Sequence, residues 1–368
     1  MKSAVRTPSS QLVTVFGGSG FLGRHVVWAL ARRGYRIRVA VRRPDLAGYI
    51  IPMGLVGQIH AVQANLRYPG SVAQAAANAD AVVNLVGILQ PTGRQTFDAV
   101  QAEGAHAVAE AAPEGSTLVH VSAIGADPNS ESAYARTKAH GETAAFGAKR
   151  DAIVMRPSVI FGPYDTFLNR FAGLARALPV LPLAGAQTRF QPVYAGDVAE
   201  AIARAVDGAV APGRVYELGG PEVRTLQELI EFVLRVTNRR RLVVPLPQAA
   251  ARAQATVLET LDRLTLGLMP DMIKLTRDQV TLLGRDNVVS SEAASEGRTL
   301  EGIGITPETL EAVAPGYLVR FRKTGQFDRA RKPDSQAPDQ VAPVSGGPGS
   351  QLDPENAPGP AMGQKAAG

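Results

Sequence analysis

Three polar residues in the middle of the chain have the types and the spacing that hydride transfer requires. Ser122 closes an apolar run, and Tyr134 and Lys138 follow it one helical turn apart, so both of their side chains would project from the same helix face. A lysine charge stabilises a tyrosinate, and the tyrosine exchanges a proton with a substrate oxygen that the serine also holds. We therefore expect Ser122, Tyr134 and Lys138 to form a catalytic set. Whether the set still turns over a substrate stays open at this point.

A glycine-rich stretch near the N-terminus would hold the dinucleotide for such chemistry. It follows an apolar strand and opens an amphipathic helix, which is the context that makes a glycine pattern informative. Gly17 permits a tight turn, Gly20 lets a pyrophosphate approach the backbone, and Gly23 lets the helix pack against the strand. The N–H groups at the helix N-terminus would bind the phosphates; a structural turn without a ligand is the alternative. The expected cofactor contacts in this loop are Gly17, Gly18, Ser19, Gly20, Phe21, Leu22 and Gly23.

The end of the next apolar run indicates which dinucleotide the loop would bind. An NAD-preferring site has an acidic side chain here, which bonds to the ribose 2′-hydroxyl. This chain has Arg42 and Arg43 instead, and a guanidinium offers a planar fork and a positive charge to a 2′-phosphate. The sequence therefore predicts NADPH as the cofactor, with Arg24 as a further supporting residue. Two solvated arginines at a strand end are the alternative.

Further cofactor contacts are expected where the other strands end. Asn65 follows the third expected strand and is placed to bond the adenine edge, and the backbone from Asn84 to Gly87 would run past the adenosine ribose. Tyr134 and Lys138 would lie at the nicotinamide ribose. Beyond the glycine loop, the expected set is Arg42, Arg43, Asn65, Leu66, Val86, Gly87, Ser122, Tyr134, Lys138 and Pro157.

Alternating apolar runs and helical stretches must position these residues. Strands that alternate with helices of this length are typical of βαβ crossovers, which give a parallel sheet with helices on both faces. The expected strands are 12–16, 36–41, 59–64, 81–86, 117–122 and 152–159, and the expected helices are 20–33, 71–79, 97–111 and 132–148. The predicted fold class is α/β, a Rossmann-type doubly wound parallel sheet with a smaller C-terminal α/β lobe.

The second half of the chain keeps this alternation less regularly. Thr225 and Glu228 are spaced as a capping box, which predicts the start of a helix that runs to Thr237. A further helix is expected over 248–268, where an apolar stripe indicates a core face, with contact to a partner as the alternative. The apolar stripes of the two helices are Leu229, Phe232, Val233 and Val236, and Val257, Leu261, Leu264 and Leu268.

These patterns divide the chain into four expected segments. We expect an N-terminal extension (1–10), an NADP(H)-binding Rossmann domain (11–160) and a substrate-side or docking lobe interleaved with the Rossmann core (161–328). The remaining segment (329–368) is rich in proline and glycine and poor in large apolar residues, so it cannot bury enough surface to offset the entropy of ordering. We expect this tail to be disordered.

Composition narrows the classes of protein and of site. The chain has no cysteine, which excludes a disulfide, a thiolate nucleophile and an iron–sulfur cluster, and its five histidines lack metal-ligand spacing, so no metal is expected. A formal net charge of +6 suggests anionic partners, but the arginines form no tract interleaved with aromatics, so nucleic acid is not expected. The sequence has no apolar stretch of membrane-spanning length and no secretory signal. These features favour a bacterial cytoplasmic protein or one bound peripherally to the inner face of a membrane.

The glycine loop with Ser122, Tyr134 and Lys138 resembles the extended and atypical short-chain dehydrogenases/reductases. Three further stretches, 155–171, 190–197 and 276–290, resemble the nucleotide-binding accessory subunit of respiratory complex I, the alpha-subcomplex subunit nine family of NADH:ubiquinone oxidoreductase. The stretch 276–290 is the most specific of the three. The resemblance covers roughly residues 13–322.

This resemblance implies properties that the residues alone do not show. It implies a tightly held NADPH with a structural or regulatory role and no direct part in electron transfer. It also implies contact with other complex I subunits on the peripheral arm near the membrane junction, at the cytoplasmic face of a bacterial inner membrane, with peripheral membrane contact. The intact set of Ser122, Tyr134 and Lys138 keeps an alternative open, a soluble NADPH-dependent reductase or epimerase that acts on an unknown alcohol or carbonyl.

Overall fold

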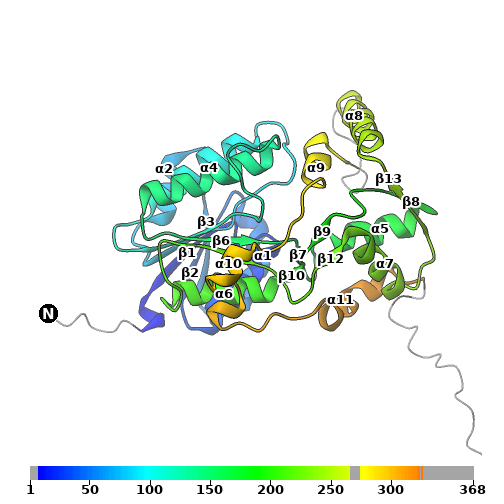
Figure 1. Ribbon diagram of the computed structural model, residues 1–368. Helices are drawn as coiled ribbons and strands as arrows, with labels where there is room; N and C mark the ends of the chain where they lie inside the picture. The colour runs from blue at the N-terminus through cyan, green and yellow to red at the C-terminus, as the bar shows by residue number, and fades with distance from the viewer. Residues whose placement is uncertain (1–6, 266–273, 324, 326–368) are drawn as a thin grey trace, which may run out of the picture. The chain divides into compact units, whose positions relative to one another are not determined.

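A parallel sheet of seven strands lies at the centre of the described residues, in the order β11-β6-β5-β4-β1-β2-β3 (Figure 1). The computed structural model describes residues 7–265, 274–323 and 325. The chain crosses from β3 back to β4 beside β1, so the strand order reverses at β1, which is where doubly wound sheets bind their ligands. The strands are β1 (Leu12–Phe16), β2 (Arg36–Val41), β3 (Ile59–Gln63), β4 (Ala81–Asn84), β5 (Thr117–Val121), β6 (Ile153–Pro157) and β11 (Val215–Leu218).

Helices cover both faces of this sheet, because successive side chains of a strand point to opposite faces. Val13 and Val15 of β1 pack with α1 (Phe21–Arg32) and α6 (Ala195–Val206) in one cluster. Phe16 packs in a second cluster, to which the helices of the other face contribute. These helices are α2 (Pro69–Ala76), α3 (Glu103–Ala111) and α4 (Ala133–Ala148). Figure 1 shows α2 and α4 on one side of the sheet and α6 on the other. The Rossmann-type α/β fold class is therefore confirmed.

Most differences from the expected elements lie at their ends. The helix expected over 71–79 ends at Ala76, and Asn78 then takes a left-handed conformation with φ of 59°. The helix expected over 97–111 begins with a π-helical turn, η3 (Asp98–Ala102), before α3. The strand β11 was not expected. It comes from the second half of the chain and pairs with β6 as an edge strand of the central sheet.

The C-terminal lobe has its own hydrophobic core, formed by its helices and by short strand pairs. The capping box at Thr225 is confirmed, and the apolar face of the helix that it opens is buried as expected. The strand pairs are β8 (Val180–Ala184) with β13 (Leu242–Leu246), β7 (Ile160–Phe161) with β10 (Val193–Tyr194), and β9 (Arg189–Phe190) with β12 (Arg224–Thr225). The helices of this lobe are α5 (Leu168–Ala177), α7 (Leu226–Val236), α8 (Gln248–Leu264), α9 (Arg277–Leu282) and α11 (Leu310–Leu318). The helix α10 (Ser291–Ser295) lies beside the central sheet instead (Figure 1), where the N–H of its N-cap residue Ser290 donates to the carboxylate of Glu217 in β11. The short 3-10 helices of the chain are η1 (Pro8–Ser10), η2 (Pro44–Met53), η4 (Glu301–Ile303) and η5 (Val319–Phe321).

The expectation of a buried stripe on α8 was wrong. Val257, Leu261 and Leu264 are 58%, 44% and 74% exposed, because the helix buries a different face, through Ala251 and Ala255. Helical spacing shows that residues share a face, and it does not show what covers that face. Leu268 and the expected disordered tail lie outside the described residues. Within the described ranges, no helix is both long and apolar enough to cross a membrane.

We expect Gly23→Ala to lower the free energy of unfolding by about 2 kcal/mol or more. A methyl group at Gly23 would overlap the carbonyl oxygen of Gly17 and lie 2.6 Å from the carbonyl carbon of Gly18, and backbone atoms cannot move aside cheaply. Gly48→Ala is the matched control, because a methyl group there has no atom within 4 Å. Urea unfolding of both variants measures the difference. Equal midpoints for the two would show that the close approach of α1 to the turn is not a constraint.

Candidate dinucleotide site

The glycine loop forms a compact turn between β1 and α1. Gly17 has a φ of 80°, a conformation that favours glycine, and its carbonyl oxygen accepts a hydrogen bond of 3.0 Å from the Gly20 N–H. Gly20 precedes α1 as its N-cap residue with no capping side chain. The first N–H groups of α1 therefore have no capping side chain as a partner, as the binding of a pyrophosphate requires.

The ends of β1 and β4 meet beside this turn. A β-carbon at Gly17 would lie 3.2 Å from a methyl group of Val86, and one at Gly87 would lie 3.2 Å from the ammonium nitrogen of Lys138. The side chain of Asn84 accepts a 3.1 Å hydrogen bond from the Val86 N–H and so fixes the backbone where the strand ends. The structure thus brings Gly17, Val86, Gly87 and Lys138 together along one edge of the sheet.

Ser122 and Lys138 are buried at the same edge. Ser122 is 4% exposed, and its hydroxyl oxygen has no hydrogen-bond partner among the residues that the structure describes. Lys138 is 5% exposed and donates a 3.1 Å hydrogen bond to the carbonyl oxygen of Val121. Burial lowers the pKa of Lys138 to about 8, against the opposing effect of the Glu142 carboxylate. A hydroxyl group without a partner beside a buried cation marks a place where a polar ligand atom would be stabilised.

Tyr134 lies on α4 with Lys138, but its surroundings favour the neutral phenol. Burial of the hydroxyl raises the pKa of Tyr134 to about 12, and the carboxylate of Asp278 acts in the same direction. The ring also makes an edge-to-face contact with Phe97, with ring centroids 5.9 Å apart. The spacing of Tyr134 and Lys138 could not show this, because Asp278 comes from a distant part of the chain.

The two arginines after β2 differ in their surroundings. Arg43 forms an ion pair of 2.7 Å with Asp45, and both side chains are exposed. Arg42 is exposed and makes no hydrogen bond or ion pair with the residues that the structure describes. Arg42 is therefore the residue whose charge is available to a phosphate at this strand end.

Three other expected cofactor residues have local structural contacts. The side-chain oxygen of Asn65 accepts a 3.2 Å hydrogen bond from the Arg67 N–H and so shapes the turn after β3. Leu66 packs against Gly104, and Pro157 is buried at the end of β6, where its carbonyl oxygen accepts from the Ile124 N–H at 3.1 Å. These contacts place Asn65 and Pro157 at the ends of strands, and the contact of any of the three with a cofactor stays a prediction.

Three side chains from outside the glycine loop, those of Arg24, Tyr49 and Tyr164, surround it. The hydroxyl of Tyr49, in η2, donates to the carbonyl oxygen of Ser19. The guanidinium of Arg24 lies 4.7 Å from the ring centroid of Tyr49 and 5.1 Å from that of Tyr164. The sequence suggested Arg24, but no local signal pointed to the tyrosines. For Asp278 the sequence does contain a local signal. Thr276 and Gln279 have the spacing of a capping box, which predicts a helix start at this position, and they form that box in the structure.

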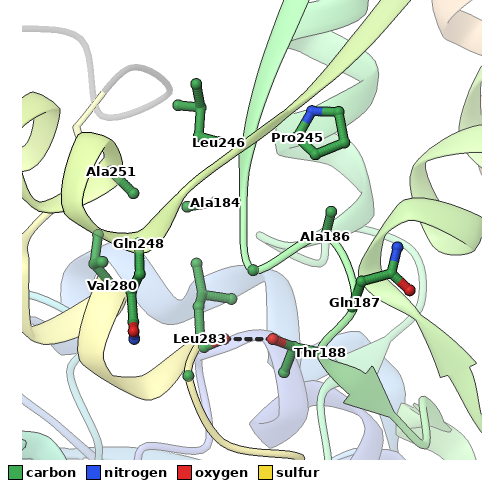
Figure 2. Close-up of a pocket in the computed structure, with 12 residues that line it drawn as sticks. Ala184, Ala186, Gln187, Thr188, Pro245, Leu246, Gln248, Ala251, Val280 and Leu283 are labelled. Carbon is green, nitrogen blue, oxygen red and sulfur yellow. Dashed lines mark hydrogen bonds between the residues drawn. The ribbon is translucent and has the colours of Figure 1, made fainter.

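A cavity in the C-terminal lobe lies away from these strand ends. It has a volume of about 300 Å³ and is lined by residues such as Ala184, Leu246 and Val280, and by none of the expected site residues (Figure 2). The described part of the chain also contains no group of three or more side chains that could hold a metal ion.

The buried charge of Lys138 predicts a pH-dependent stability. In the cofactor-free protein the folded pKa is about 8 against 10.5 for the free side chain, so the unfolded chain binds more protons between these values and stability rises with pH. Relative to Lys138→Met, we expect the free energy of unfolding of the wild type to gain about 2 kcal/mol between pH 7 and pH 9.5. Urea unfolding at both pH values measures this. If the difference in free energy of unfolding between the wild type and Lys138→Met is the same at pH 7 and at pH 9.5, the pKa of Lys138 is not depressed.

The chain is similar in sequence to several known proteins. Residues 13–219 match the NAD dependent epimerase/dehydratase family. The mitochondrial NADH dehydrogenase (ubiquinone) 1 alpha subcomplex subunit 9 of Arabidopsis thaliana is 32% identical over 323 residues, which is 86% of this chain and 79% of that protein. A ceramide reductase of Caulobacter vibrioides is 34% identical over 194 residues, 52% of this chain and 60% of that protein.

The fold is shared with solved structures. The NADPH-dependent quinone oxidoreductase QOR2 of Escherichia coli, solved as a complex with NADPH, has a TM-score of 0.63 at 20% identity, over 83% of this chain and 99% of that one. The matched range 13–219 holds the glycine loop, Ser122, Tyr134 and Lys138, and the match to subunit 9 extends well beyond it. The chain therefore belongs to the NAD dependent epimerase/dehydratase family and, within it, to the subunit 9 family of respiratory complex I.

Proposed function

We propose that the chain is an NADP(H)-binding accessory subunit of a bacterial respiratory complex I. The dinucleotide is a structural or regulatory ligand in this proposal and has no direct part in electron transfer. The observation that carries the proposal is a complete dinucleotide loop in a chain that matches subunit 9 over 86% of its length. Such a site can bind a cofactor and orient it.

The residues fit a dinucleotide. The bare N-terminus of α1 suits a pyrophosphate, and the unpartnered hydroxyl of Ser122 and the ammonium group of Lys138 suit the oxygen atoms of the nicotinamide half. Arg42 supplies a free positive charge where a 2′-phosphate would lie, which supports NADPH over NADH. When bound, this cofactor could supply a hydride, and the residues of this chain would bind and orient it.

Two features support a docked protein. The apolar residues Val257, Leu261 and Leu264 of α8 are exposed, and the chain carries a formal net charge of +6. We place the protein among other complex I subunits, on the peripheral arm near the membrane junction at the cytoplasmic face, bound peripherally. The resemblance to subunit 9 supports this assignment.

A soluble NADPH-dependent reductase or epimerase is the second candidate. The intact set of Ser122, Tyr134 and Lys138 favours it, and one bacterial relative carries the name of a reductase. In this candidate function, Tyr134 would act as general acid on the carbonyl oxygen of a substrate. The raised pKa of Tyr134 would have to fall when cofactor and substrate bind.

We expect Arg42→Ala to weaken NADPH binding about ten- to a hundredfold and to change NADH binding little. A charge-assisted hydrogen bond to a phosphate contributes roughly 1.5–3 kcal/mol, and NADH lacks the 2′-phosphate. Arg43→Ala is the matched control with a smaller expected effect, because Asp45 already pairs with this guanidinium. Titration calorimetry with both dinucleotides measures the affinities. Equal affinity of the wild type for NADPH and NADH would remove the case for a 2′-phosphate site.

We expect Gly20→Val to lower the amount of assembled complex I, whereas Tyr134→Phe should leave it near normal. A side chain at Gly20 would stand where a pyrophosphate must approach the backbone, so cofactor binding should fail. Tyr134→Phe removes one hydroxyl group and keeps the ring in contact with Phe97. Native gels of membranes from cells that carry each variant measure assembly, and quinone-linked NADH oxidation measures function.

The reductase hypothesis predicts a different pattern for the same two variants. Both would lose a separate NADPH-dependent activity, and complex I would be unaffected by either. An unchanged amount of complex I in the Gly20→Val cells, after loss of NADPH binding has been confirmed on the purified variant, would rule out the structural-ligand role.

A further inference from the structure

We infer that Asp278 is a positioning residue that locks the cofactor helix α4 to the C-terminal lobe. Through this contact, cofactor binding at α4 and the packing of α9 strengthen each other. The inference rests on the proposed function, because it takes the dinucleotide to contact Tyr134 and Lys138 on α4. It explains how a ligand without a reaction could hold the structure of a distant segment.

Asp278 binds the start of α4 with both of its carboxylate oxygens. One oxygen accepts a 2.7 Å hydrogen bond from the N–H of Ala133, the first residue of the helix, and the other accepts a 2.9 Å bond from the hydroxyl of Ser132. The first N–H groups of a helix have no partner within it, and a negative charge there is favourable. Ser132 is the N-cap residue of α4 and also accepts from the Ala135 N–H. The helix that carries Tyr134 and Lys138 is therefore capped jointly by its own serine and by a carboxylate from α9.

The other side of α9 is anchored in the C-terminal lobe. Val280 is buried against Ala184, Ala251 and Ala255, and the Thr188 hydroxyl donates to the carbonyl oxygen of Leu283. Figure 2 shows Val280 beside Ala251 of α8 and the bond between Thr188 and Leu283. Because α9 packs firmly on this side, Asp278 reaches α4 from an element that is itself held in place.

Two further residues of the same segment bind the loops that follow β5 and β6. Arg285 forms a 3.1 Å ion pair with Asp127. The side chain of Asn287 donates to the carbonyl oxygen of Ile124 at 3.1 Å and accepts from the Ser158 hydroxyl at 2.7 Å. Residues 276–287, which we call the latch, thus contact the loop from Ser122 to Tyr134 near both of its ends. Asp278 is the latch residue that touches the helix itself.

The latch creates a coupling between two sites. A ligand that binds Tyr134 and Lys138 stabilises α4 in the position in which the Ala133 N–H and the Ser132 hydroxyl bond to Asp278. Coupling of this kind is reciprocal, so closure of the latch must raise the affinity for the ligand by the same factor by which the ligand favours closure. Typical couplings between sites change affinities about five- to 150-fold.

Hydrogen exchange of the full-length protein with and without NADPH tests the coupling. In the wild type we expect NADPH to slow exchange of the α9 amides about fivefold or more, and Asp278→Ala should abolish this slowing while the glycine loop stays protected. Asp286→Ala is the matched control. Asp286 lies in the same segment and bears the same charge, but it binds Arg189 of the C-terminal lobe, through an ion pair of 2.7 Å. In the Asp286→Ala variant, NADPH should slow exchange of the α9 amides as it does in the wild type.

A second variant removes the same contact from the other side. Ala133→Pro takes away the N–H donor at the first position of a helix, which accepts proline well, and it leaves Asp278 in place. The Ala133→Pro variant should also reduce the NADPH-induced slowing of amide exchange in α9. Calorimetry should show the NADPH dissociation constant raised about fivefold or more in Asp278→Ala and Ala133→Pro and unchanged in Asp286→Ala. Asp278→Asn keeps an oxygen that can accept from Ala133 and should recover most of the response.

The outcomes separate this inference from the proposed function. If the wild type binds NADPH but the α9 amides exchange at the same rate with and without it, the latch coupling is wrong and the cofactor role stands. An undiminished response in both Asp278→Ala and Ala133→Pro also overturns the coupling. If the wild type binds no NADPH, the proposed function fails and this inference fails with it.

Discussion

The close approach of α1 to the turn after β1 is the constraint on which the rest of the site depends. A β-carbon at Gly23 would overlap the backbone of Gly17 and Gly18, and one at Gly18 would lie 2.7 Å from a methyl group of Val39. Only glycine lets the helix start against the strand end in this way. With the helix in that place, its first N–H groups lie at the strand-order reversal, next to the end of β4 and one strand away from the end of β5. The expected cofactor residues at the ends of β4 and β5 and on α4 then lie at this same edge of the sheet.

Burial shifts the pKa values of the titratable side chains at this edge of the sheet. It lowers the pKa of Lys138 to about 8 and raises that of Tyr134 to about 12. Burial, with the charge of Lys138, also lowers the pKa of His120 to about 3, and the imidazole lies 3.3 Å from the Asn84 amide nitrogen. All three groups are pushed toward their neutral forms. A site of this kind gains from a ligand whose oxygen atoms solvate the lysine.

The sequence could predict the first half of the molecule because its signals are local. Strand and helix periodicity, the glycine spacing and the pair Tyr134 and Lys138 each involve neighbouring residues, and the elements that they predicted are present. The pairing of β11 with β6 and the reach of Asp278 to α4 depend on contacts between distant segments, which no window of the sequence contains. The stripe on α8 failed for the same reason, since the spacing of Val257 and Leu261 cannot tell a covered face from an exposed one.

The late position of β11 in the chain has a consequence for how the protein is made. The edge strand that pairs with β6 and the helix α6 that packs against α1 both follow residue 194, after the first part of the second lobe has been synthesised. A nascent chain that ends near residue 160 would expose the open edge of β6 and the apolar side of α1 to other chains. The seven-stranded sheet can therefore be completed only when about 220 residues have left the ribosome. Chaperone binding to translating ribosomes should be concentrated in the interval between the emergence of β6 and that of β11.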